Sequence, residues 1–161
     1  MPDDSRPAVI GLISDTHGLL RPSVHNALAG VDLILHAGDV GGSEILDELR
    51  IIAPVQAVFG NTDAPDDPNL QGELKISSNG ISIHVSHGHE LGAPTPQRLL
   101  AAYPQDVLVY GHTHRQFVSR IDGRLIVNPG AAGPRRFDVE PSVARLTIVN
   151  GKAEVEIVPL D

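Results

Sequence analysis

The sequence predicts an α/β fold in which two packed β-sheets are covered by helices on the outside. In the first part of the chain, short apolar runs alternate with amphipathic segments, which is the pattern of parallel strands joined by helices. The second part carries three two-residue turn signals, Asn79-Gly80, Asp122-Gly123 and Asn150-Gly151, each between two apolar runs. Such hairpins predict antiparallel strands, so the two parts together predict two packed sheets.

The first part is predicted to hold three strands and two helices. A helix over 22–29 has a proline in its first turn. A helix over 43–52 has Ser43 as its N-cap and four apolar side chains on one face. The strands are short apolar runs typical of a buried parallel sheet, and they cover 8–13, 33–35 and 55–59.

The second part is predicted to be mostly strand, with one helix over 96–103. Its hairpins join the runs that flank the three turn signals, and one further apolar run forms a strand without such a partner. The predicted strands cover 73–78, 81–86, 107–110, 115–121, 124–127, 143–149 and 153–158.

The composition is that of an ordinary globular protein. The chain has 161 residues, of which 41% are hydrophobic and 20% charged, so we expect one continuous domain over residues 1–161. A formal charge of −8 disfavours a protein that holds nucleic acid through a basic face. Two tyrosines, three phenylalanines and no tryptophan are too few for a base-stacking platform, so no nucleic-acid partner is expected.

The residue types that the sequence lacks exclude several classes of site. Without cysteine the chain has no disulfides, iron–sulfur ligands, thiolate zinc sites or cysteine nucleophile. No apolar run reaches the roughly 18 residues of a membrane helix, and the start is acidic where a signal peptide is basic. We therefore expect a cytoplasmic protein with no membrane partner. An antiparallel edge strand could pair with a second copy, which leaves a homo-oligomer open.

Polar side chains of the metal-ligand type follow five of the predicted strands. Ligands of open α/β sheets bind beyond the carboxyl ends of the strands, so these side chains are aimed at one place. Residues two apart in extended chain project to the same side, as in the pairs Asp15 and His17, His87 and His89, and His112 and His114. The pairs are Asp15 and His17, His36 and Asp39, Asn61 and Asp63, His87 and His89, and His112 and His114.

This set of side chains predicts a metal centre. Imidazole and oxygen ligands without thiolate suit Mn²⁺, Zn²⁺, Fe or Ni²⁺ better than Ca²⁺. Two carboxylates, one amide and four imidazoles are more than one ion needs, so two ions that share a bridging carboxylate fit the count. Loop histidines bonded to the backbone are the ordinary alternative for any single motif, but five motifs in order favour the metal centre.

The five motifs resemble those of the calcineurin-like metallophosphoesterase superfamily, and they stand in the family's order. The short length and the late NPG at 128–130 are similar to the family's small bacterial and archaeal phosphodiesterases. The resemblance runs from about residue 9 to residue 135 and implies a four-layer α/β/β/α sandwich with two mixed β-sheets. The motifs are SDTHG at 14–18, HAGD at 36–39, GNTD at 60–63, SHGH at 86–89 and GHTH at 111–114.

The resemblance also implies ligands and a reaction. The reaction is hydrolysis of a small phosphoester by a hydroxide that bridges two ions and attacks phosphorus in line. Mn²⁺ is favoured for both ions, with Zn²⁺, Fe or Ni²⁺ as alternatives. Asn61 would also orient the phosphate. One ion would be held by Asp15, His17 and His114 and the other by Asn61, His87 and His112, with Asp39 as the catalytic bridge.

Two positions depart from the family pattern. Thr62 stands where many relatives have a GNHD histidine that serves as a general acid, and a threonine hydroxyl titrates too high for that role. His89 and His36 are the remaining candidates for the catalytic proton donor, with hydrogen bonding to a metal ligand as the alternative role of each. Ala131 replaces a serine that often follows NPG. Arg135, in the same loop, is a candidate for binding the substrate phosphate, with plain surface exposure as its alternative.

The predicted function is that of a metal-dependent phosphodiesterase. Phosphomonoesterases, including protein phosphatases, are usually longer and retain the GNHD histidine, so Thr62 favours diesters. A scaffold-type binding module is a further alternative, because one eukaryotic relative of this fold is a subunit of a sorting coat with an impaired site. Scaffolds tend to lose histidines from the motifs, whereas this sequence keeps all four ligand histidines, which favours an enzyme.

Overall fold

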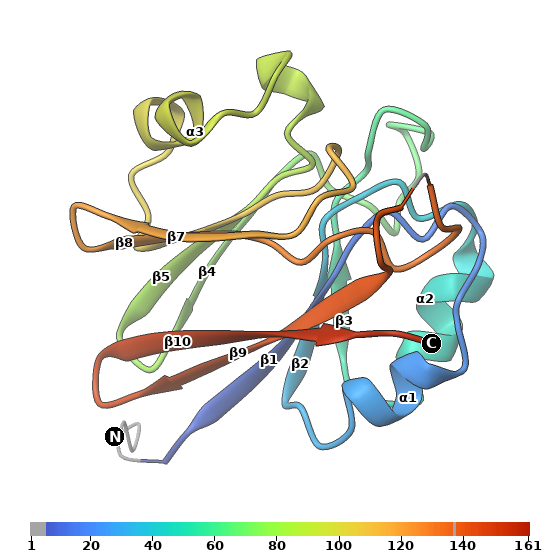
Figure 1. Ribbon diagram of the computed structural model, residues 1–161, viewed down its shortest axis with the longest axis horizontal. Coiled ribbons are helices and arrows are strands. Elements are labelled where there is room, and N and C mark those ends of the chain that lie inside the picture. Colours follow the sequence, from blue (N-terminus) through green and yellow to red (C-terminus); the bar gives the residue numbers. More distant parts are fainter. Residues whose placement is uncertain (1–5, 137) are drawn as a thin grey trace.

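A computed structural model describes residues 6–136 and 138–161 of the chain. Two five-stranded sheets pack face to face, and helices lie on their outer faces (Figure 1). The predicted α/β fold with two mixed sheets is therefore confirmed. Apolar side chains that alternate along the strands of both sheets form one buried cluster between them.

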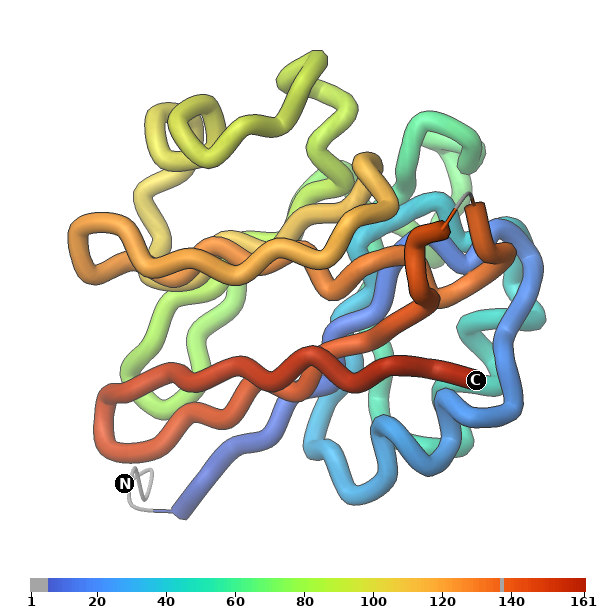
Figure 2. Tube along the Cα trace, in the orientation of Figure 1, coloured from blue at the N-terminus to red at the C-terminus, as the bar shows by residue number. Residues whose placement is uncertain are grey.

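The first sheet is built around parallel strands that the first part of the chain supplies. They are joined by α1 (Ser23–Ala27) and α2 (Ser43–Leu49), which cover the outer face of this sheet. The strands are β1 (Ala8–Ile13), β2 (Leu33–His36), β3 (Val55–Ala57), β9 (Ser142–Val149) and β10 (Lys152–Pro159), in the order β10-β9-β1-β2-β3. The hairpin of β9 and β10 therefore returns to the first sheet and pairs antiparallel with β1 (Figure 2).

The second sheet mixes hairpins with parallel neighbours. Its hairpins are antiparallel, as predicted, whereas the central pairs are parallel. A short 3₁₀ turn, η1 (His89–Leu91), and α3 (Pro96–Ala102) cross its outer face. The strands are β4 (Leu74–Ser78), β5 (Ile81–Val85), β6 (Val107–Val109), β7 (Phe117–Ile121) and β8 (Arg124–Asn128), in the order β4-β5-β6-β8-β7.

The backbone at the three predicted hairpin turns has the required left-handed conformation. The first turn residues, Asn79, Asp122 and Asn150, have φ angles of 48°, 52° and 53°, and the following glycines also have positive φ. Two successive residues with positive φ define a type I′ turn, whose twist matches that of the flanking strands. Each of these turns therefore fixes the register of its hairpin.

The boundaries of the first two helices differ from those predicted. The first covers only Ser23–Ala27, and α2 ends at Leu49. Ser43 is the first residue of α2, and the N-cap position falls on Gly42, with no side-chain capping bond. The chain enters α2 through Gly41 and Gly42, whose φ angles of 87° and 134° are accessible to glycine, and this displaces the cap by one residue. Among the described residues, no helix is long and apolar enough to span a bilayer.

The core between the sheets should dominate stability. Leu35 on β2 is fully buried there, whereas Ile51, after α2, is 78% exposed. We expect Leu35→Ala to lower the free energy of unfolding by about 2–5 kcal/mol, because it removes buried methyl groups and leaves a cavity. Ile51→Ala is the matched control and should change it by less than about 0.5 kcal/mol. Urea unfolding of both variants checks this, and equal losses would contradict the assignment of the core.

Candidate metal centre

Loops that follow β1, β2, β5 and β6 bring most of the predicted ligands together at one edge of the two sheets. The β1 and β2 loops are hydrogen-bonded to each other, since the Asp15 amide donates to Gly38 and the His17 amide to Asp39, both at 2.9 Å. Across the sheets, the His112 amide donates to Asp15 Oδ2 at 3.1 Å. Backbone contacts therefore fix the positions of the side chains.

The first group of possible ligands is Asp15, His17 and His114. Asp15 Oδ1 lies 3.6 Å from His17 Nε2 and 3.3 Å from His114 Nε2, and the two imidazole nitrogens are 3.4 Å apart. The other carboxylate oxygen is occupied, because Oδ2 accepts hydrogen bonds from the Ser14 hydroxyl and the His112 amide. Asp15 Oδ1 is buried and receives no hydrogen bond from the described residues. Such an orphaned oxygen is costly unless a cation binds it, so this group fits a metal ion.

The second group is centred on His87. Its Nδ1 lies 2.7 Å from the carbonyl of Ala37, and a carbonyl can only accept, so Nδ1 carries the proton. Its Nε2 then faces Asp39 Oδ2 at 3.2 Å and Asn61 Oδ1 at 3.1 Å, while Asp15 Oδ1 lies 3.9 Å away. With the proton on Nδ1, Nε2 can accept but not donate, and the same holds for Asp39 Oδ2 and Asn61 Oδ1. These three atoms therefore need a proton or a metal ion between them.

Asp39 lies between the two groups. Its Oδ2 is 3.5 Å from His17 Nε2 in the first group and 3.2 Å from His87 Nε2 in the second. Its Oδ1 accepts hydrogen bonds from the amide of Thr62 at 3.0 Å and from its hydroxyl at 2.8 Å. One carboxylate oxygen is thus held by the protein while the other faces both sets of imidazoles. No motif in the sequence indicates this role of Thr62, because the two hydrogen bonds join loops that are distant along the chain.

His112 and His89 lie beside the second group and are both half-buried. The ring centroid of His87 is 5.2 Å from that of His112 and 5.3 Å from that of His89. The His89 and His112 centroids are 6.4 Å apart. His89 Nδ1 is 2.8 Å from Glu90 Oε1, but it makes no hydrogen bond with the described residues.

The structure places His36 beneath the centre. Its Nδ1 accepts a hydrogen bond from the Gly38 amide at 3.1 Å. Its Nε2 lies 3.0 Å from the hydroxyl of Thr16, which donates to the carbonyl of Val40, so Nε2–H is the donor to Thr16. Both ring nitrogens are engaged and the side chain is fully buried. This geometry favours a positioning role for His36 over proton donation to a substrate.

The loop after β8 packs against the centre. Asn128 of the NPG motif donates to the Gly111 carbonyl at 3.1 Å and to the Thr113 hydroxyl at 3.0 Å. Farther along, the Ala132 amide donates to the carbonyl of Ser14. Arg135 is exposed on the same loop, and its contact with substrate stays a prediction. Asp63 has a structural role, because it accepts hydrogen bonds from the amides of residues 40, 41 and 60.

Five of the predicted ligands have a left-handed backbone. Outside the three hairpin turns, all non-glycine residues with positive φ among the described residues belong to this set. This conformation costs an L-residue about 1–2 kcal/mol, and clusters of it are typical of functional sites. The strain is thus concentrated on the side chains that converge. The residues are Asp15 (55°), His17 (47°), Asp39 (54°), His112 (71°) and His114 (64°).

The imidazoles keep the two carboxylates ionised. Burial by itself raises the pKa of Asp15, but His114, His17 and the charge of His87 outweigh it and lower the pKa well below its usual range. Burial also opposes ionisation of Asp39, whose pKa is nevertheless lowered to about 2 by His87 and Thr62. The centre is therefore anionic at neutral pH and attracts cations.

The pKa values of two histidines, His36 and His87, are shifted in opposite directions. Burial lowers the pKa of His36 to about 4. Burial also works against protonation of His87, yet the adjacent carboxylates of Asp39 and Asp15 raise its pKa overall. In the protein without metal, His87 therefore tends to hold a proton at the place where a metal ion would bind.

Comparisons with known proteins agree with this geometry. The family model described as calcineurin-like phosphoesterase superfamily domain matches residues 9–151. A probable metallophosphoesterase of Methanocaldococcus jannaschii is 37% identical over 162 residues, which cover 95% of this chain and 82% of that protein. A phosphodiesterase of the same archaeon is 26% identical over 139 residues, covering 75% of this chain and 82% of that protein. The crystal structure of Vps29 with Zn²⁺ from Entamoeba histolytica has a TM-score of 0.75 at 26% identity and covers 95% of this chain and 99% of that one.

The strained backbone predicts an unusual response to glycine. At His112, glycine should give a more stable metal-free protein than alanine, by about 1 kcal/mol, because it adopts positive φ without strain. At His25, in α1, the order should reverse by a similar amount, because glycine is unfavourable inside a helix. Urea unfolding in EDTA of His112→Gly, His112→Ala and the same pair at His25 checks both signs. Alanine being better at both positions would contradict the strain.

His36 should make stability depend on pH. In the unfolded chain its pKa is near 6.5, whereas the folded protein keeps it neutral down to about 4. Its contribution is therefore present above pH 6.5 and is lost as the pH falls toward 4. Between pH 7.5 and 4.5 this amounts to about 2–3 kcal/mol. In EDTA, His36→Gln should lose that much less stability than the wild type over the same interval, and an unchanged difference would exclude a buried neutral His36.

Proposed function

The chain belongs to the calcineurin-like phosphoesterase superfamily, and from this premise we propose that it is a phosphodiesterase that uses two divalent metal ions. The observation that carries the proposal is the buried Asp15 Oδ1, which receives no hydrogen bond from the described residues and lies among imidazole nitrogens that also face Asp39 Oδ2. These atoms form two adjoining groups of possible ligands that share Asp15, which suits two neighbouring ions.

The roles of the ligands follow from these contacts. Bound divalent ions supply Lewis acidity at the phosphoryl oxygens and lower the pKa of water so that hydroxide forms near neutral pH. Mn²⁺ is proposed for both ions. Thr62 fixes Asp39 by two hydrogen bonds, and Ala37 fixes the tautomer of His87. Asp15, His17 and His114 are proposed to hold one ion and Asn61, His87 and His112 the other, with Asp39 between them.

Substrate contacts are proposed at the exposed rim. Asn61 is exposed, so its amide can donate to a phosphoryl oxygen while its carbonyl oxygen faces His87. Arg135 is proposed to reach a second phosphoryl oxygen from its exposed loop. His89 is half-buried beside the second group, and we assign it as the proton donor to the leaving alcohol.

The structure supports a preference for diesters through Thr62. Its hydroxyl donates to Asp39 Oδ1, so it is turned toward the bridge and not toward a leaving group. A site without the GNHD acid suits esters whose leaving group departs easily. One relative in this family is named a phosphodiesterase. A phosphomonoesterase, including a protein phosphatase, is the alternative within the same chemistry.

A scaffold role is the second candidate, because vacuolar protein sorting 29 shares this fold. Metal binding does not separate the two functions, since a Vps29 structure is described with Zn²⁺. The complete set of ligand histidines favours the enzyme. Turnover is therefore the measurement that distinguishes them.

We expect faster hydrolysis of bis-p-nitrophenyl phosphate than of p-nitrophenyl phosphate by EDTA-treated protein after Mn²⁺ is restored. Asp39→Asn should lower the rate at least about 100-fold, because loss of even an outer partner of a metal ligand costs 10–100-fold. Asp47→Asn, on the exposed face of α2, makes the same charge change away from the site and should leave the rate unchanged. Initial rates with matched metal content check this.

Other results of these rate measurements would favour the phosphomonoesterase or the scaffold, or would contradict a catalytic metal centre. Faster monoester hydrolysis that Asp39→Asn abolishes would replace the diester preference by a phosphomonoesterase. Wild-type rates in Asp39→Asn would contradict a catalytic metal centre. No turnover of either ester, with two ions bound per chain, would favour the scaffold.

A further inference from the structure

A second cleft lies at the end of the sheets opposite the metal centre. It has a volume of about 310 Å³ and is lined by the starts of β5 and β6 and by the β7–β8 and β9–β10 turns. Ile81 begins β5 and His87 follows its end, so six residues of nearly extended chain, about 20 Å, separate the two places. The cleft therefore has no part in the phosphoesterase site, and its volume is at the small end of the range for ligand pockets.

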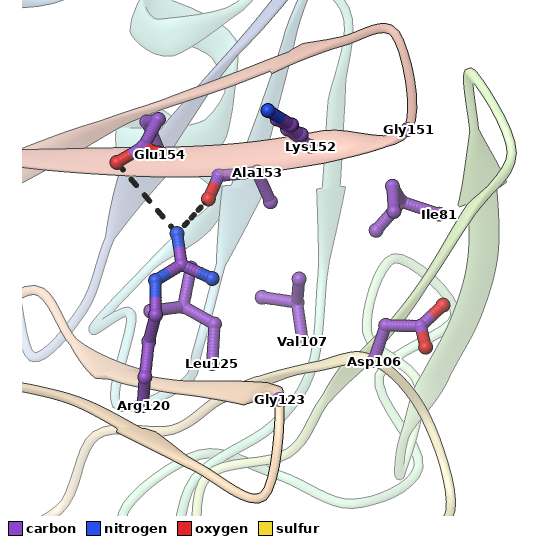
Figure 3. Close-up of a pocket in the computed structure, with 10 residues that line it drawn as sticks. All are labelled: Ile81, Asp106, Val107, Arg120, Gly123, Leu125, Gly151, Lys152, Ala153 and Glu154. Carbon is purple, nitrogen blue, oxygen red and sulfur yellow. Dashed lines mark hydrogen bonds and ion pairs between the residues drawn. The ribbon is translucent and has the colours of Figure 1, made fainter.

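Arg120 and Asp106 face this cleft from opposite sides with apolar side chains between them, and Lys152 and Glu154 of β10 also line it. Figure 3 shows Arg120 on one side and Asp106 on the other, and Val107 and Leu125 lie between. Arg120 pairs in register with Leu125, and Leu125 with Val107, next to Asp106. Two strand spacings of about 4.8 Å therefore separate the backbone positions of the two charged residues by roughly 10 Å.

In each of the two charged side chains, Arg120 and Asp106, one terminal atom is bound to the protein and another is available to a ligand. Every side-chain hydrogen bond and ion pair of Arg120 within residues 6–136 and 138–161 uses Nη2, which donates to the Ala153 carbonyl and lies 3.6 Å from Glu154 Oε2. A terminal nitrogen of the guanidinium without such a contact faces the cleft in Figure 3. Asp106 Oδ2 accepts from the Ser82 amide and hydroxyl, both at 2.9 Å, which leaves Oδ1 for a ligand.

We propose that this cleft binds a small zwitterion whose carboxylate and ammonium groups are separated by a short apolar chain. The carboxylate would bind Arg120, the ammonium would bind Asp106, and the chain would lie over Val107 and Leu125. Because both charged side chains are already anchored, a ligand binds them with little loss of side-chain freedom. An ω-amino acid has this chemistry, whereas a dipeptide has the same two charges on either side of a polar peptide bond.

Amide NMR of the ¹⁵N-labelled, Zn²⁺-loaded protein tests the site with 6-aminohexanoate and with alanyl-alanine. We expect saturable shifts at the amides of Gly123 and Gly151 in the cleft, and not at Gly38 and Gly88 beside the metal centre. The probe that binds more tightly shows whether the cleft prefers an ω-amino acid or a dipeptide. Hexanoate and hexylamine, which each lack one charge, should bind at least about 10-fold more weakly than 6-aminohexanoate.

A matched pair of variants tests whether the carboxylate of Asp106 binds the ligand's ammonium group. Asp106→Asn should weaken binding of 6-aminohexanoate about 10-fold, since it removes the charge but keeps an acceptor for Ser82. Asp122→Asn, in the exposed β7–β8 turn, makes the same change without lining the cleft and should bind normally. The proposal is overturned by equal binding of hexanoate or hexylamine, by an equal effect of both variants, by shifts only beside the metal centre, or by no saturable shift with either zwitterion.

Discussion

The carboxylate of Asp15 is the group around which the metal centre is organised. It is buried, one oxygen is held by Ser14 and the His112 amide, and the other faces three imidazoles without a hydrogen bond from the described residues. Its own backbone is left-handed. Because the His112 amide comes from the second sheet, this one carboxylate also joins the two sheets at their functional edge. The Nε2 atoms of His17, His87 and His114 all lie within 3.9 Å of its other oxygen.

Close backbone approach explains why glycine occurs in the motifs. A Cβ atom at Gly60 would lie 2.1 Å from Asp39 Oδ1, and one at Gly111 would lie 2.1 Å from Ser14 Oγ and 2.6 Å from Asp15 Oδ2. Neither position has space for a side chain. The glycines let the loops close over the carboxylates, and the left-handed ligands turn their side chains inward. The motif spacing is thus a property of the packed loops as much as of the metal ligands.

Local signals in the sequence predicted the strands and hairpins well because turn chemistry and apolar runs act over a few residues. They did not place the β9–β10 hairpin beside β1, since that pairing depends on contacts between distant parts of the chain. The same division holds at the site. The residues that converge could be named from their motifs, whereas the bonds from Thr62 to Asp39 and the engagement of both nitrogens of His36 arise only when separate loops meet.

At the proposed metal centre, a proton and a metal ion would compete for the same place. His87 has its Nδ1 proton fixed by Ala37, and the adjacent carboxylates raise the pKa of its ring, so without metal a second proton at Nε2 offsets the charge of Asp39. A metal ion at that place must displace this proton, and its apparent affinity therefore increases with pH. The left-handed backbone of the converging residues lowers the stability of the metal-free protein. An ion that binds the folded protein alone would add its binding free energy to the stability of the fold, which couples occupancy of the centre to folding.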